Sequence, residues 1–174
     1  MAWLRGFVAR LSGTAELPAD FAGELTGDER VLAVARSAEG PLVATHLGLW
    51  LPSGRRLGWH LVSKATWNDG ALTLIESAES GPAGEAVLLR DLPPQRVALT
   101  EPGRLPEVVH ERVTGSIRST QHREFPAGGA RFVQRKVPGR NGLVLQVRAD
   151  PGTDEDALAP VAAEVAQRLR GAAR

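Results

Sequence analysis

The sequence of 174 residues contains no cysteine. It therefore cannot form disulfides, cysteine-type zinc sites, iron–sulfur clusters or a thiol nucleophile, and this absence is typical of a reducing compartment. It also has no run of about 18 apolar residues, so no transmembrane segment is predicted. Arg5 and Arg10 interrupt the apolar residues near the N-terminus, which does not fit a signal peptide. These absences predict a cytoplasmic protein.

The motifs of common catalytic sites are also missing. The sequence has no G-x-S-x-G, S-x-x-K, P-loop or G-x-G-x-x-G motif. The four histidines are far apart, and His110-Glu111 is followed by Thr114 where a zinc motif needs a second histidine. Carboxylates that lie close together, such as Glu76 and Glu79, fall in predicted turns or at a helix start. The sequence therefore predicts no catalytic residue, no cofactor and no metal site, and favours a protein that is not an enzyme.

Lysine occurs only twice, whereas arginine, alanine, glycine, leucine and valine are abundant, as in proteins encoded by GC-rich genomes. The net charge of +1 is unevenly distributed. Residues 13–101 hold 7 basic and 12 acidic side chains, a net charge of −5, and residues 104–148 hold 9 basic and 3 acidic ones, a net charge of +6. This asymmetry indicates either an anion-binding face or two regions that attract each other within the molecule.

The N-terminal segment of residues 1–27 is predicted to start with a short amphipathic helix. Trp3, Leu4, Phe7, Val8 and Leu11 fall on one side of it. This apolar side is expected to pack on the protein's own core or on a second copy, which makes a homodimer possible. The alternative is a surface anchor for an anionic membrane.

Residues 28–102 show short strands separated by closely spaced turn signals, a pattern typical of a small antiparallel β-sheet or barrel. Asp69-Gly70 predicts a tight hairpin turn, because both residues tolerate a positive φ, and places Trp67 close to Leu72. The three tryptophans of this region are expected in the barrel core. The predicted strands cover residues 31–35, 42–45, 49–51, 56–60, 62–67, 71–76, 85–90 and 96–100.

The apolar period changes in residues 103–174. A helix is predicted over residues 106–120, followed by a β-hairpin of residues 131–137 and 143–148. A C-terminal helix is expected to begin near Thr153, which can cap it, and Pro160 indicates a kink or a later start. The predicted class is thus α+β: a small antiparallel barrel or sheet, then an α-β-β-α extension packed on it.

Several stretches resemble known families. Residues 28–35, 42–45, 48–51, 56–60 and 64–74 are similar to bacterial domains with a pleckstrin-homology-like (PH-like) barrel. The resemblance implies a binding or scaffold module for lipids, peptides or other subunits, without catalysis, and no binding residues can be transferred. Residues 109–118 and 132–140 resemble a family of uncharacterised conserved proteins from high-GC Gram-positive bacteria.

The basic region between residues 112 and 140 is the candidate binding site. Arginine side chains bind phosphates, lipid headgroups and carboxylates, and an aromatic ring between them can stack on a base. The sequence therefore predicts a non-catalytic binding or scaffold protein that engages an anionic partner. Nucleic-acid binding is the first alternative, and a small hydrolase with an unfamiliar site is the second. The candidate contact residues are Arg112, Arg118, Arg123, Arg131, Phe132, Arg135 and Arg140.

Overall fold

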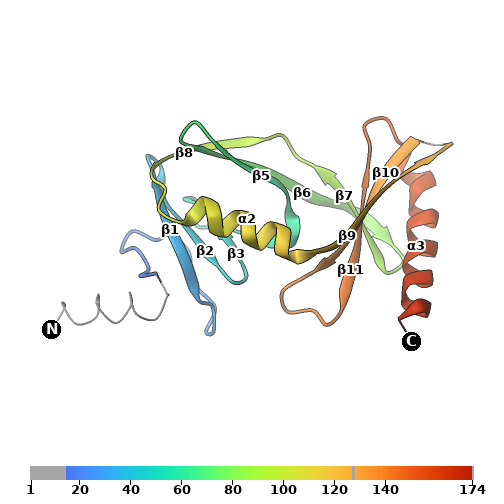
Figure 1. Ribbon diagram of the computed structural model, residues 1–174, viewed down its shortest axis with the longest axis horizontal. Coiled ribbons are helices and arrows are strands. Elements are labelled where there is room, and N and C mark those ends of the chain that lie inside the picture. Colours follow the sequence, from blue (N-terminus) through green and yellow to red (C-terminus); the bar gives the residue numbers. More distant parts are fainter. Residues whose placement is uncertain (1–14, 127, 174) are drawn as a thin grey trace. The chain divides into compact units, whose positions relative to one another are not determined.

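The structure is a computed structural model that describes residues 15–126 and 128–173. It is of the α+β class, with 11 strands in a mostly antiparallel sheet and two α-helices in the described residues (Figure 1). The amphipathic segment expected in residues 1–12 lies outside this part of the chain. The strands are β1 (Val31–Ser37), β2 (Gly40–Thr45), β3 (Gly48–Trp50), β4 (Arg56–Gly58), β5 (Val62–Asn68), β6 (Ala71–Ala83), β7 (Ala86–Asp91), β8 (Gln95–Glu101), β9 (Ile117–Phe125), β10 (Gly128–Lys136) and β11 (Leu143–Ala149), and the helices are the 3-10 helix η1 (Trp59–Leu61), α2 (Leu105–Ser116) and α3 (Glu155–Ala172).

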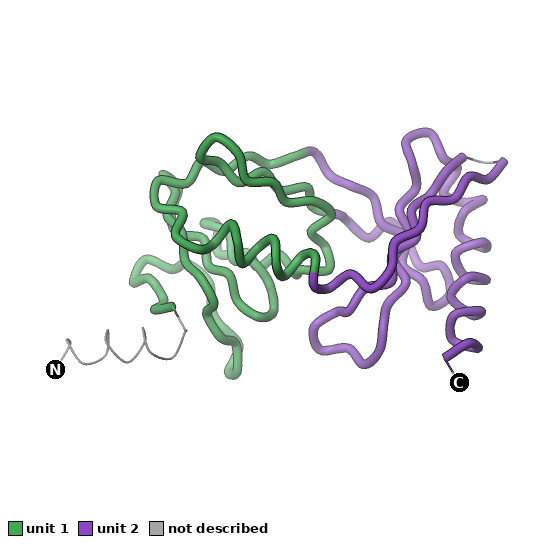
Figure 2. Tube along the Cα trace, viewed as in Figure 1, with its two compact units in different colours: residues 1–76, 94–114 green, residues 77–93, 115–174 purple. Residues whose placement is uncertain are grey.

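The chain forms two compact units (Figure 2). Within the described residues, unit 1 consists of residues 15–76 and 94–114, and unit 2 consists of residues 77–93, 115–126 and 128–173. Strand β6 runs from one unit into the other. This division differs from the one at residues 102–103 expected from the sequence, because β7 pairs in parallel with β11 and so joins the C-terminal strands.

Unit 1 contains an open sheet with the strand order β4-β3-β2-β1-β8-β6, and β5 pairs with β6. Among the described residues, β4 pairs only with β3 and β5 only with β6, so the expected barrel is not closed. Strand β4 is three residues long and runs directly into η1. The chain therefore leaves the ladder before a closing pair can form.

The hairpin between β5 and β6 confirms one detailed expectation. Asp69 has φ 49° and Gly70 has φ 69°, the positive values that a two-residue turn of this kind needs. Trp67 is paired directly with Leu72 across the ladder, as predicted. The two turn residues are sufficient to predict which strand residues pair, because the register of a hairpin follows from its turn type.

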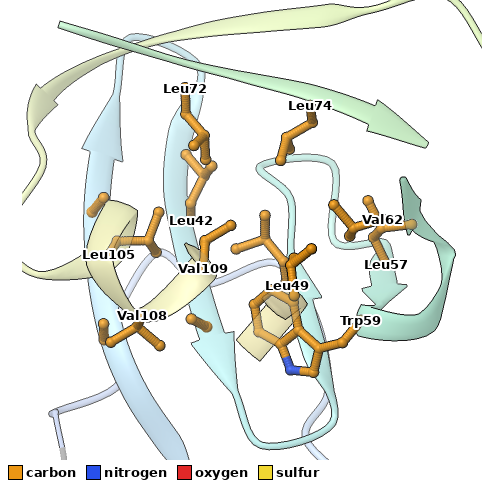
Figure 3. Close-up of a cluster of buried hydrophobic side chains, with 14 of the residues drawn as sticks. Leu42, Leu49, Leu57, Trp59, Val62, Leu72, Leu74, Leu105, Val108 and Val109 are labelled. Carbon is orange, nitrogen blue, oxygen red and sulfur yellow. The ribbon is translucent and has the colours of Figure 1, made fainter. Parts of the chain in front are cut away.

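The core of unit 1 lies between the sheet and α2 (Figure 3). Helix α2 buries a stripe at spacings of three and four residues, which is the helical period. Burying each large apolar side chain of this kind contributes about 1.5–3 kcal/mol. The helix stripe is Leu105, Val108, Val109 and Val113, and the sheet contributes Leu42, Leu49, Leu57, Leu72 and Leu74, with Trp59 and Val62 beside them.

Unit 2 contains the strand order β6-β7-β11-β10-β9, with α3 packed on one face of the sheet. The helix contributes Leu158, Ala162 and Ala166 to a core that also holds Phe132 and Val147. Its N-cap is not the predicted Thr153. The Asp154 carboxylate accepts hydrogen bonds from the Asp156 and Ala157 amides, whereas the Thr153 hydroxyl donates to the Gly129 carbonyl. Pro160 lies inside the helix, which does not begin later.

Strand β9 was not predicted. The sequence predicts a helix that extends to residue 120, but α2 ends at Ser116, directly after Gly115, and residues 117–125 form a strand paired with β10. Residues 118–124 are all exposed and polar. Since none of these seven side chains is buried, this part of the strand lacks the apolar–polar alternation that identifies a strand.

Candidate functional site

The seven candidate contact residues do not form one surface. Arg112 is exposed on α2 in unit 1, and the other six belong to unit 2. Within unit 2 these six residues do not all lie on the same face of the sheet. Arg131 lies opposite His122 in the β9–β10 register, and Arg123 lies opposite Ala130. Because neighbouring residues of a strand point to opposite faces, Arg123 and Arg131 lie on different faces of the sheet.

Arg135 is buried, with 1% of its surface exposed. Its Nε donates a hydrogen bond of 2.7 Å to the Ser116 hydroxyl. Burial, and secondarily the charge of Arg148, lower the pKa of Arg135 to about 10. Burial also lowers the pKa of Arg148. Arg135 is therefore part of the interior and does not contribute to an exposed contact surface.

Phe132 is also an interior residue. It is 5% exposed and packs edge-on against Phe125, with 6.0 Å between the ring centroids. The guanidinium carbon of Arg123 lies 5.6 Å from the centroid of the Phe132 ring, within the range of a cation–π contact. Arg123 thus covers the ring, which is not a free platform for a base.

Among the candidate residues of unit 2, the exposed cations are Arg118, Arg123, Arg131 and Arg140. Arg118 donates to the Gly115 carbonyl and Arg123 to the Gln121 side chain. In the described part of the chain, none of these four arginines forms an ion pair with a carboxylate. Residues 117–149 carry seven basic side chains against the single carboxylate of Glu124, a net charge of +6. The excess positive charge expected from the sequence is thus concentrated on β9–β11 and their loops.

A cluster of titratable side chains lies at one end of the β9–β10 hairpin. His122 Nε2 is 2.6 Å from Asp150 Oδ2, and His122 Nδ1 is 3.8 Å from Glu124 Oε1. The His122 and Asp150 side chains are 41% and 38% exposed. The sequence does not predict this cluster, because Asp150 follows β11 and only the pairing of β9, β10 and β11 brings it to His122. The spacing His-x-Glu on one strand was the sole signal in the sequence.

A groove of 790 Å³ lies in unit 1 between the β5–β6 hairpin and the start of α2. Its walls include Trp67 and Leu72 on the sheet side and Glu107, His110 and Glu111 on the helix side. Trp67 is 42% exposed, so it is not the core residue that the sequence predicts, whereas Trp50 and Trp59 are buried. The His122–Asp150 pair lies in the other unit and is not part of this groove.

Glu29 is a carboxylate buried in unit 1. It accepts hydrogen bonds from the Thr45 hydroxyl at 2.5 Å, Trp50 Nε1 at 2.9 Å and the Thr26 amide at 3.1 Å, and it pairs with Arg56 at 2.8 Å. Burial raises its pKa, but these hydrogen bonds and the charge of Arg56 outweigh burial, so the pKa of Glu29 is lowered overall. All these partners are structural, which makes Glu29 a fold-stabilising residue.

Comparison with known proteins adds no assignment: no protein-family model, no curated protein and no solved structure matches this chain. In the described residues, neither helix is both long and apolar enough to cross a membrane.

Proposed function

We propose that the protein is a non-catalytic binding or scaffold protein that engages an acidic protein partner through exposed arginines of β9 and β10. One observation carries this proposal. Strand β9 is an edge strand whose residues 118–124 are all exposed, and Arg118, Arg123 and the adjacent Arg131 have no carboxylate partner in the described part of the chain. The resemblance of residues 28–100 to PH-like binding modules supports the same class.

An edge strand offers two kinds of contact. Its outward backbone N–H and C=O groups can pair with an added strand, and its side chains select the partner by charge. Natural edge strands often carry charges that prevent pairing with copies of themselves. Arg118 and Arg123 repel a second β9 strand and attract an acidic one, so they favour a different, acidic chain as the partner.

The proposal is tested with a fluorescent poly-glutamate peptide as the probe, in anisotropy titrations at low and at physiological salt. The variant Arg118→Glu/Arg131→Glu is compared with Arg90→Glu/Arg96→Glu, which makes the same change of charge at exposed strand arginines elsewhere. Charge steering by a specific surface predicts at least a tenfold loss of affinity in the first variant and less than a threefold loss in the second.

Equal losses in both variants would show that only net charge matters, and the proposal would then be rejected. A short DNA duplex and a single-stranded RNA are titrated alongside the peptide. If either binds more tightly than the peptide, with an affinity that falls steeply with salt, the partner is a nucleic acid and the acidic-protein proposal fails.

A further inference from the structure

We infer that His122, Glu124 and Asp150 form a binding site for a divalent transition-metal ion such as Zn²⁺. Each residue offers one ligand atom, and the three atoms lie within 4.8 Å of one another. His122 and Glu124 are two residues apart on β9, and Asp150 follows β11. Two elements far apart in the sequence thus place an imidazole and two carboxylates around one point on the surface.

The backbone around this point holds the Asp150 carboxylate in place. The Asp150 amide donates to the Gly129 carbonyl at 2.9 Å, and the Thr153 hydroxyl donates to the same oxygen at 2.7 Å. A Cβ at position 129 would lie 2.2 Å from Asp150 Oδ2 and 3.1 Å from His122 Nε2. The cluster therefore depends on a glycine at position 129, because the Asp150 carboxylate occupies the space that a Cβ would fill.

The ligand types select the class of ion. One imidazole nitrogen with two carboxylate oxygens suits Zn²⁺, Co²⁺, Ni²⁺ or Mn²⁺, whereas Ca²⁺ and Mg²⁺ prefer sites built from oxygen alone. Two carboxylates offset the charge of a divalent ion, and the nearest cation in the register, Arg131 opposite His122, reduces the affinity without cancelling it. Since the ligand residues are partly or fully exposed, water can complete the coordination.

The contact between His122 and Asp150 is close to the geometry that a metal needs. Two ligands on one metal, each at about 2.0–2.1 Å, are about 3 Å apart. The observed distance between Nε2 and Oδ2 is 2.6 Å, so a small rotation of the Asp150 side chain opens the space for the ion. In the metal-free protein these two atoms form a hydrogen bond with each other at the place where the ion would bind.

The experiment is a calorimetric titration of the full-length protein, freed of metal with a chelator, with zinc chloride at neutral pH. The site predicts one ion per chain with a dissociation constant in the micromolar range or tighter. His122→Ala and Asp150→Asn are expected to weaken binding at least tenfold, and Glu124→Gln severalfold. His110→Ala removes an exposed histidine from the other unit and serves as the matched control, with binding unchanged.

Glu124→Gln keeps the exposed strand and the His122–Asp150 contact, so it tests the site even if the other variants fail to fold. A second readout is the NMR signal of the His122 ring, which shifts with one equivalent of Zn²⁺ if the site is correct. The inference is overturned if the wild-type protein gives no binding heat and no shift of that signal at tenfold excess Zn²⁺. It is also overturned if His110→Ala abolishes binding while His122→Ala does not.

Discussion

The two units place their charged side chains differently. Unit 1 buries a carboxylate, Glu29, and surrounds it with donors from three segments of the chain. Unit 2 carries five arginines on β9–β11 and a sixth in the loop between β10 and β11, several of them exposed and without carboxylate partners among the described residues. A buried charge that is fully hydrogen-bonded stabilises one arrangement of the chain, whereas exposed charge of one sign remains available to a partner.

The largest expected effect is at the buried charge of unit 1. Glu29→Ala leaves the Thr26, Thr45 and Trp50 donors without an acceptor, and removing one partner from a buried ion pair typically costs about 3–5 kcal/mol. Glu24→Ala, at an exposed carboxylate, is expected to change stability by less than about 0.5 kcal/mol. The measurement is denaturant unfolding followed by tryptophan fluorescence, which reports on unit 1 because Trp50, Trp59 and Trp67 lie in its described residues and unit 2 holds no tryptophan in its described residues. Equal stability of the two variants would contradict the structural role of Glu29.

A comparable loss is expected in the core of unit 2. Phe132→Ala removes a buried ring that packs against Phe125 and under Arg123, which costs about 3–5 kcal/mol. Hydrogen exchange of the β10 and β11 amides measures this change within unit 2. If Phe132 instead served as a ligand platform, its replacement would weaken binding to the acidic probe and leave amide protection unchanged. Phe132→Leu, which keeps most of the buried volume, is expected to lose less.

An intermediate effect is expected at the His122 cluster. Gly129→Ala places a methyl group against the Asp150 carboxylate, and overpacking of this kind costs about 1–3 kcal/mol. The variant is also expected to weaken Zn²⁺ binding, because Asp150 must move away from His122. Gly81→Ala, where an added Cβ meets nothing within 4 Å, is the control in the same unit. Thermal unfolding measures the stability of both variants, and calorimetry measures their affinity for Zn²⁺. Equal stability and equal affinity of the two variants would argue against the tight packing around Gly129.

Protonation of Glu29 is expected to have a smaller effect than its removal. Its folded pKa lies below the ordinary glutamate value of 4.5, so its charge stabilises the folded state above pH 4.5, and this contribution is lost as the pH falls through the folded pKa. Between pH 6 and pH 3, the wild type is therefore expected to lose more stability than Glu29→Gln, which does not titrate at this position. Parallel declines of the two proteins would show that other carboxylates account for acid unfolding.

Much of unit 1 was predictable because local signals determine its elements. The Asp69-Gly70 turn and the paired Trp67 and Leu72 follow from turn chemistry, and the apolar stripe of α2 from its period. The exposure of Trp67 was not predictable. Its strand pattern resembles that of the buried tryptophans, and only the packing of the hairpin beside the start of α2 leaves it on the wall of a groove.

The candidate site was predictable in composition and not in arrangement. The sequence identified the basic stretch, but Arg131 and Arg135 lie on the same face of β10, where Arg131 is exposed and Arg135 is buried beside Ser116. Phe132 belongs to the core because α3 covers that face of the sheet. The His122 cluster had no sequence motif, since its third member, Asp150, lies 28 residues further along the chain.

The sequence by itself determined the mixed α and β class, the positions of most strands, the hairpin turn and the excess of positive charge in the second half, because each depends on neighbouring residues. Only the tertiary structure decided that β6 continues into the second unit, that β7 belongs to that unit, that β9 is an edge strand, and which arginines are exposed. These features depend on strand pairing and on which face of a sheet is covered, and both join residues far apart in the chain. The proposed contact surface and the proposed metal site both depend on strand β9, which the sequence did not reveal.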